Sequence, residues 1–426
     1  MLHWVTLLAA QAFASSSDAA AVQAYERGEF AKAELYWESR LGVALQSTDD
    51  EEVVLVESNL ASCLRELNRY AEAEAYFADA IQIGERFGKD SPGLSAPLEG
   101  LAISRMLKGD LDGALELVSR AEGIDKRTSA DGGPRGETAL VHASILLQKR
   151  RLDEAAAIAS EALAEWEKRG RPRTPTYAVG LSLMGHVAYQ SGKFREAEEY
   201  YRRALRILEE LGVPDHPNSA AFYSNLAQVK AAKNKTKEAE ELLNRAIELW
   251  TRRLGPDSAD IALALNNLSS IYGQRKKYVK ARALLDRAFQ IDVLRFGAMS
   301  ARAATDLNNL GALAMSRRDY ATAESMFSQA ADIFRRRLGF AHPDAAVATA
   351  NLASVYTAQK RYKEAEQSFR EAIQLRERSA GSEDPALAPL LEQYARVLRA
   401  DQDYAGAAKI EVQAMRIRVR HALESK

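Results

Sequence analysis

Residues 351–372 read NLASVYTAQKRYKEAEQSFREA, and the order of small and large residues in this stretch decides the fold. Ala365 and Ala372 lie seven residues apart, so they share one face of a helix, and Phe369 lies between them. Small side chains allow two helix axes to approach to about 8–10 Å. The stretch therefore predicts two closely packed helices that are joined at a polar corner just before Tyr362.

The same pattern recurs along the chain as an internal repeat, with spacings of 40 to 42 residues. Each copy has an anchor alanine and a small residue twelve positions before it. A second alanine follows seven positions after the anchor in every copy but the first, which has Arg40. Large apolar residues fill the positions between them, as a packed two-helix unit requires. The ten anchors are Ala33, Ala73, Ala114, Ala155, Ala197, Ala239, Ala281, Ala323, Ala365 and Ala407.

Glycine and proline mark the ends of the predicted helices. Glycine adopts the left-handed conformation that closes a helix without steric cost, and proline suits the first position of the next helix. Five copies place a glycine after the second helix, namely Gly212, Gly255, Gly297, Gly339 and Gly381. Following helices are predicted to begin at His216-Pro217, His342-Pro343 and Asp384-Pro385.

In this order the small, aromatic and alanine positions resemble the tetratricopeptide repeat, and the 42-residue form resembles its kinesin light chain-type subclass. One copy carries the resemblance in Asn267-Leu268, Tyr272, Tyr278, Ala281 and Ala288. Another carries it in Asn351-Leu352-Ala353, Tyr356, Tyr362, Glu364-Ala365-Glu366 and Ala372. The resemblance covers roughly residues 17–425. It implies an all-α, right-handed superhelical solenoid of about ten helix-turn-helix repeats.

The N-terminal residues 1–14 are predicted to be a signal peptide. A short apolar stretch ends in Ala12-Phe13-Ala14, an A-x-A cleavage pattern, and polar residues follow it. This predicts cleavage after Ala14 and export to a periplasmic or extracellular location. Because the first residues contain no Lys or Arg, a cytoplasmic protein is the alternative. The stretch is too short to span a bilayer, so no integral membrane span is expected.

The repeats fall into three predicted groups. A glycine-rich stretch, SADGGPRG at residues 129–136, is predicted to be the most flexible part of the chain. It separates irregular early repeats from regular later ones. The groups are repeats one to three at residues 17–130, repeat four at residues 131–173, and the regular repeats five to ten at residues 174–425.

Composition argues against several classes of function. The 58 basic and 59 acidic residues leave a net charge of −1, so no strong field attracts nucleic acid. Cys63 is the only cysteine and is predicted to be a buried small hydrophobe. The six histidines lack the spacing of metal ligands, and no set of nucleophile and base is evident. We therefore expect neither an enzyme nor a bound metal or cofactor.

The resemblance implies that the first helix of each repeat lines the concave side of the solenoid. Polar residues recur there fourteen, fifteen and eleven positions before the anchors. A row of amides can hydrogen-bond the main chain of an extended peptide. Alternatively, each Asn bonds the neighbouring repeat and only fixes the stacking. The predicted groove residues are His186, Ser224, Asn225, Gln228, Asn266, Asn267, Ser270, Asn308, Asn309, Asn351 and Ser354.

Two classes of function follow from these patterns. The first is a protein–protein interaction scaffold or adaptor that binds an extended peptide segment of a client protein in the concave groove. The second is a structural assembly subunit of an envelope or secreted complex, which self-associates through its end or convex faces. Both predict a protein partner, and neither predicts nucleic acid.

Overall fold

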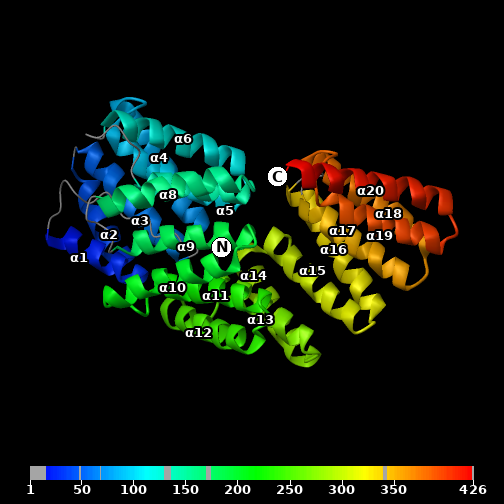
Figure 1. Ribbon diagram of the computed structural model, residues 1–426. Coiled ribbons are helices and arrows are strands. Elements are labelled where there is room, and N and C mark those ends of the chain that lie inside the picture. The colour runs from blue at the N-terminus through cyan, green and yellow to red at the C-terminus, as the bar shows by residue number, and fades with distance from the viewer. Residues whose placement is uncertain are drawn as a thin grey trace. The chain divides into compact units, whose positions relative to one another are not determined.

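The computed structural model describes residues 16–47, 49–67, 69–128, 136–168, 174–338 and 343–424. These residues form twenty α-helices and two short 3-10 turns, and no strand occurs among them (Figure 1). The predicted all-α repeat fold is confirmed. Two compact units divide the chain, Met1–Ala264 and Leu265–Lys426, and each is treated by itself below.

The N-terminal unit contains six helix pairs, and the two helices of each pair pack on each other. Two 3-10 turns, η1 (Glu85–Phe87) and η2 (Pro92–Leu94), follow the second pair. The helices are α1 (Ser16–Glu26), α2 (Phe30–Ala44), α3 (Asp50–Glu66), α4 (Tyr70–Gly84), α5 (Ser95–Leu107), α6 (Leu111–Thr128), α7 (Gly136–Gln148), α8 (Leu152–Lys168), α9 (Pro175–Gln190), α10 (Phe194–Glu210), α11 (Pro217–Ala232) and α12 (Thr236–Leu254).

The C-terminal unit contains repeats seven to ten. Its first helix, α13, begins in the N-terminal unit and continues into this one. Here too the paired helices are antiparallel neighbours in the chain, joined by short corners. The helices are α13 (Ala259–Gln274), α14 (Tyr278–Phe296), α15 (Ala301–Ser316), α16 (Tyr320–Leu338), α17 (Pro343–Ala358), α18 (Tyr362–Ala380), α19 (Leu387–Ala400) and α20 (Tyr404–Glu424).

The anchor alanines lie at the helix contacts, as their pattern predicts. All ten are 0% exposed, and each lies in the second helix of its repeat. The small residue of the first helix faces a large residue of the second. A Cβ atom added at Gly311 would come within 2.9 Å of the Phe327 ring, and one at Gly185 would come equally close to Tyr201. Small and large side chains therefore interlock within a repeat.

Ala288 offers a direct test of this packing. Its side chain is 0% exposed on α14, seven residues after the anchor Ala281. We expect Ala288→Leu to lower the free energy of unfolding by about 1–3 kcal/mol, because the added methylene groups overpack the helix contact. Urea denaturation would measure the loss. A neutral result would mean that α14 does not meet its neighbour at this residue.

The corners between paired helices share one backbone conformation. The residue five positions before the anchor has a positive φ, between 57° and 87°, in every corner that the structure describes. Glycine occupies this position only in Gly28, Gly109 and Gly192. Four of the glycines predicted to follow a second helix also have positive φ, whereas Gly339 lies outside the described residues. The predicted helix start at Pro385 is wrong, because α19 begins two residues later at Leu387.

The first repeat packs against the sixth within the N-terminal unit. A Cβ atom on Gly28 would come within 2.2 Å of the Pro217 side chain, and the rings of Phe30 and His216 lie 6.2 Å apart, edge to face. Leu254, at the end of α12, packs against the core of the first repeat. Six repeats therefore bring the chain back to its first helix pair. Arg40, the exception to the alanine pattern, pairs with Asp18 at 3.2 Å and also with Glu52.

Several sequence predictions stay untested by this structure. The predicted signal peptide, residues 1–14, lies outside the described residues, and so does almost all of the glycine-rich stretch at residues 129–136. The three predicted groups of repeats therefore remain a prediction. Cys63 is 0% exposed, and burial raises the pKa of its thiol, in agreement with the predicted buried hydrophobe.

Candidate functional site

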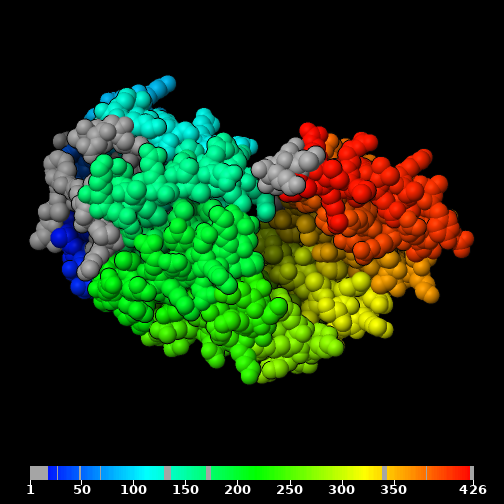
Figure 2. Space-filling view, viewed as in Figure 1, coloured from blue at the N-terminus to red at the C-terminus, as the bar shows by residue number. Residues whose placement is uncertain are grey.

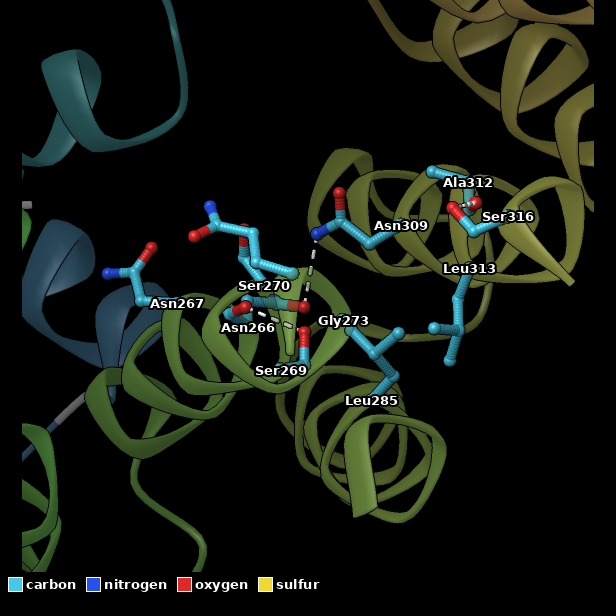
Figure 3. Close-up of a pocket in the computed structure, with 11 residues that line it drawn as sticks. Asn266, Asn267, Ser269, Ser270, Gly273, Leu285, Asn309, Ala312, Leu313 and Ser316 are labelled. Atoms are coloured by element: carbon cyan, nitrogen blue, oxygen red, sulfur yellow. Dashed lines mark hydrogen bonds between the residues drawn. The ribbon is translucent and has the colours of Figure 1, made fainter. Parts of the chain in front are cut away.

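An open pocket of about 440 Å³ lies between α13 and α15, the first helices of repeats seven and eight (Figure 3). Leu285 and Leu313 form an apolar side of this pocket, and hydroxyl and amide side chains form the rest. All lining residues belong to the C-terminal unit. They are Asn266, Asn267, Ser269, Ser270, Gly273, Gln274, Leu285, Asn309, Ala312, Leu313 and Ser316.

Asparagine side chains connect neighbouring repeats beside this pocket. Asn309 Nδ2 donates a hydrogen bond to Asn266 Oδ1 over 3.1 Å (Figure 3). One repeat further on, Asn351 Nδ2 donates to Asn308 Oδ1 over 2.9 Å. In both bonds the donor lies fourteen positions before the anchor of its own repeat. The acceptor belongs to the preceding repeat and lies fifteen positions before the anchor of that repeat. We call these two bonds the amide ladder.

Asn266 also connects the ladder to a buried carboxyl pair. Its Nδ2 atom donates to Asp306 Oδ1 over 2.5 Å, and Asp306 is 0% exposed. Asp306 faces Asp292, which is 4% exposed and lies 3.6 Å from the Arg302 guanidinium. Burial, reinforced by the Asp292 charge, raises the pKa of Asp306 to about 7. The ladder therefore rests on a carboxyl group that burial and the neighbouring Asp292 make easier to protonate than an ordinary aspartate.

The remaining predicted residues of the C-terminal unit differ in their surroundings. Ser270 is exposed at the pocket rim, and Ser354 Oγ donates to its own helix at Ala350 O over 3.0 Å. Asn267 lines the pocket but points away from Asn309 (Figure 3). The Nδ2 atom of Asn267 is buried without a hydrogen-bond partner in the protein.

Four of the predicted groove residues belong to the N-terminal unit. Ser224 and Asn225 are only 3% and 7% exposed, and Asn225 Nδ2 donates to Ser182 Oγ over 3.5 Å, in the same register as the ladder. Gln228 and His186 are half-buried. Burial lowers the pKa of His186 to about 4, so its ring is neutral at physiological pH.

Asp306 was not predicted from the sequence, although a signal was present. It lies seventeen positions before its anchor, and the equivalent residues in the neighbouring repeats are Ala264 and Ala348. An acid in a position that is otherwise small and buried is unusual, because a buried carboxyl group needs a partner. Gln274 and Ser316 at the pocket rim were not predicted either, since nothing distinguishes them from ordinary surface residues.

The pocket offers hydrogen bonds rather than reactive groups. The ladder bond uses one side-chain N–H of Asn309. The second side-chain N–H and the side-chain oxygen Oδ1 remain available to a ligand. Within the part of the chain that the structure describes, no three His, Cys, Asp or Glu side chains gather as metal ligands. No helix in the same residues has the length and apolar character needed to cross a membrane.

The model of a known repeat family matches residues 52–127, 136–210, 178–252, 218–292, 302–378 and 344–418. These matches cover most of the chain, and the model is that of the tetratricopeptide repeat. The chain belongs to the tetratricopeptide repeat family. The family predicted from the small and aromatic positions is thus confirmed. Among curated proteins, none matches this tetratricopeptide repeat chain.

Solved structures of similar fold include a Rap protein complexed with Competence and Sporulation Factor. It is 15% identical over 86% of this chain and 98% of its own, with a TM-score of 0.63. BtubC (BKLC) from P. vanneervenii is 28% identical over 53% of this chain and 91% of its own, with a TM-score of 0.45. The TPR-like repeats of a putative kinesin light chain from Podosopora anserina are 18% identical over 48% of this chain and 98% of their own, with a TM-score of 0.42.

Proposed function

We propose that this tetratricopeptide repeat protein is a non-catalytic scaffold that holds an extended segment of a client protein along the first helices of repeats seven to nine. The observation that carries the proposal is the open pocket beside the amide ladder, where Asn309 has unused hydrogen-bonding atoms. A volume of about 440 Å³ suits one or two side chains of a peptide. The complex of the Rap protein with Competence and Sporulation Factor supports the use of this fold for binding.

In this geometry the recurring Asn side chains can serve both predicted roles, binding a peptide and fixing the stacking of repeats. A side-chain amide has two N–H donors and an oxygen with two lone pairs, and the ladder uses only part of them. Asn309 and Asn351 can therefore fix the stacking of repeats and still bond the main chain of a ligand. For this reason a simple Asn→Ala change does not separate binding from stability.

Blocking the pocket with a large side chain separates them better. Ala312 is exposed on α15 and lines the pocket, so Ala312→Arg fills the site without disturbing the core. Ala321 is equally exposed on α16 and provides the matched control Ala321→Arg. Both changes are expected to alter the free energy of unfolding by less than about 0.5 kcal/mol.

The experiment is affinity capture from the native host, with captured proteins identified by mass spectrometry. We expect at least one client to be lost with Ala312→Arg and retained with Ala321→Arg. Peptides that tile that client would then be titrated against the wild-type chain and both variants. Clients that bind all three chains equally would contradict the proposed groove.

A second candidate function is an assembly subunit that self-associates. The observation that favours it is the apolar side of α20, where Val412, Met415 and Val419 are each more than half exposed.

A further inference from the structure

A second open cavity, of about 560 Å³, lies among α10, α11 and α12 of the N-terminal unit. Its walls are α10 and α12, the second helices of repeats five and six, and α11 contributes its floor. These helices are green in Figure 2 and form part of the surface of this unit. We call this cavity the second-helix groove. It is lined by Arg202, Leu205, Arg206, Glu209, Tyr223, Leu226, Lys230, Glu238, Glu241, Leu242 and Arg245.

Apolar side chains form part of the floor of the second-helix groove. Tyr223 and Leu226 of α11 are 8% and 4% exposed, and Leu205 of α10 is 8% exposed. Leu242 of α12 is half-buried and keeps part of its side chain in the groove. An apolar side chain of a ligand can therefore exchange water for contacts with these residues.

An ion network with a buried lysine lies beside the apolar part of the floor. Lys230 on α11 is only 4% exposed, and its Nζ atom is 2.9 Å from Glu198 and 2.6 Å from Glu238. Both carboxylates have further cationic partners at 2.8–3.0 Å, namely Lys233 and Arg202 for Glu198 and Lys235 for Glu238. Four cations thus share two carboxylates, so the network has a surplus of positive charge.

Two arginines add to this surplus from the walls of the groove. Arg206 of α10 and Arg245 of α12 are exposed, and neither forms an ion pair with the residues that the structure describes. The Arg245 guanidinium lies 4.6 Å from the centre of the Tyr223 ring, which keeps it at the groove. Two exposed carboxylates, Glu209 and Glu241, line the groove as well. Together the groove and the network contain six cations and four carboxylates, a balance that attracts an acidic ligand.

An equivalent cavity in the C-terminal unit shows that this charge is not general to the fold. It has a volume of about 330 Å³ and lies between α18 and α20, the second helices of repeats nine and ten. Counted from the anchors, Arg206, Lys230 and Arg245 have uncharged equivalents there, namely Gln374, Leu398 and Gln413. The charged residues of that lining are balanced, with Arg370 and Lys409 against Glu377 and Asp403. Surplus positive charge therefore distinguishes the groove of repeats five and six.

We propose that the second-helix groove is a second protein-binding site, which takes an acidic segment of a partner protein. An apolar side chain of that segment packs on Tyr223 and Leu242, and flanking carboxylates meet Arg206 and Arg245. The recessed apolar floor suits a peptide side chain better than a phosphate backbone or a flat membrane surface. The site is independent of the pocket between α13 and α15, whose lining residues are all uncharged. The two sites therefore select segments of different chemistry.

The test begins with a random library of short peptides, displayed on phage and selected against the full wild-type chain. We expect enriched peptides in which acidic residues flank an apolar one. Synthetic copies should bind Arg206→Glu about tenfold more weakly than wild type, because an attraction becomes a repulsion. Lys237→Glu is the matched control, since Lys237 is exposed on α12 outside the groove lining and the charge change is the same. It should bind like wild type, and so should Ala312→Arg.

Changing the peptide tests the contact itself. When an acidic residue of the peptide is replaced by Lys, binding to wild type should fall and binding to Arg206→Glu should recover, because the charge pair is restored in reverse. Selected peptides without acidic residues, or acidic peptides that bind Arg206→Glu as tightly as wild type, would overturn the proposal. A selection in which every peptide is lost with Ala312→Arg and kept by Arg206→Glu would also overturn it, and would support the pocket between α13 and α15 instead. Failure of either site can thus be recognised separately.

Discussion

Replacing Asp306 by Asn is expected to stabilise the C-terminal unit by about 2–4 kcal/mol at pH 8 and by no more than about 2 kcal/mol at pH 5. Asp306 is 0% exposed and faces Asp292, and burial raises its pKa from 3.8 to about 7. A pKa difference of one between the folded and unfolded chains corresponds to about 1.4 kcal/mol. Asp306 and Asp292 titrate together. The full shift of the Asp306 pKa, from 3.8 to about 7, therefore sets an upper bound on the stability that Asp306→Asn can add.

The sign follows from proton binding. Between about pH 4 and pH 7 the folded chain holds a proton that the unfolded chain has released, so the contribution of Asp306 to stability falls as the pH rises through this range. Above pH 7 the folded chain must keep a buried charge near Asp292. The amide in Asp306→Asn has no charge, retains an oxygen that accepts from Asn266, and can donate to Asp292.

Urea denaturation of the wild-type and Asp306→Asn chains at pH 5 and pH 8 would measure this effect. Burial also raises the pKa of Glu57, in the N-terminal unit, to about 7. Glu57 is common to both chains, so the difference between them isolates Asp306. An Asp306→Asn chain that is less stable than wild type at pH 8 would show that the charged carboxylate is well satisfied in the fold.

The helix pairs could be predicted from sequence because their packing is local. The small residue twelve positions before each anchor and the large residue four positions after it lie in one helix hairpin, so a short pattern determines how the two helices pack. The closure of the first repeat on the sixth could not be predicted in this way. Gly28 and Pro217 are far apart in the chain, and their contact depends on the angle that accumulates between successive repeats.

The amide ladder shows a different limit of sequence reasoning. Asn309 and Asn351 stand out because Asn is a mediocre helix former that recurs in the middle of helices. Their residue type could not distinguish stacking from ligand binding, because an amide serves both. Only the distance between neighbouring first helices, which allows bonds of 3.1 and 2.9 Å, shows that the Asn side chains connect the repeats.

Asn266→Ala is expected to be the most costly change in the ladder, with a loss of about 3 kcal/mol at pH 8. Asn266 accepts from Asn309 and donates to Asp306, so its removal leaves a buried carboxylate without this donor. A hydrogen bond to a charged group contributes about 1.5–3 kcal/mol, and a neutral one about 1 kcal/mol. At pH 5, where Asp306 is protonated, the loss should fall to about 2 kcal/mol.

The double variant with Asn309→Ala tests the bond between the two amides. Asn309→Ala alone should cost about 1 kcal/mol, and the combined cost should be smaller than the sum by about 0.5–1 kcal/mol because both changes remove the same bond. Ser316→Ala, at the exposed rim of the same pocket, is the matched control and should be neutral. Strictly additive costs would mean that the Asn309–Asn266 bond contributes nothing to stacking. In that case the recurrence of Asn along these helices would be explained by ligand binding alone, and client affinity should fall with Asn309→Ala as steeply as with Ala312→Arg.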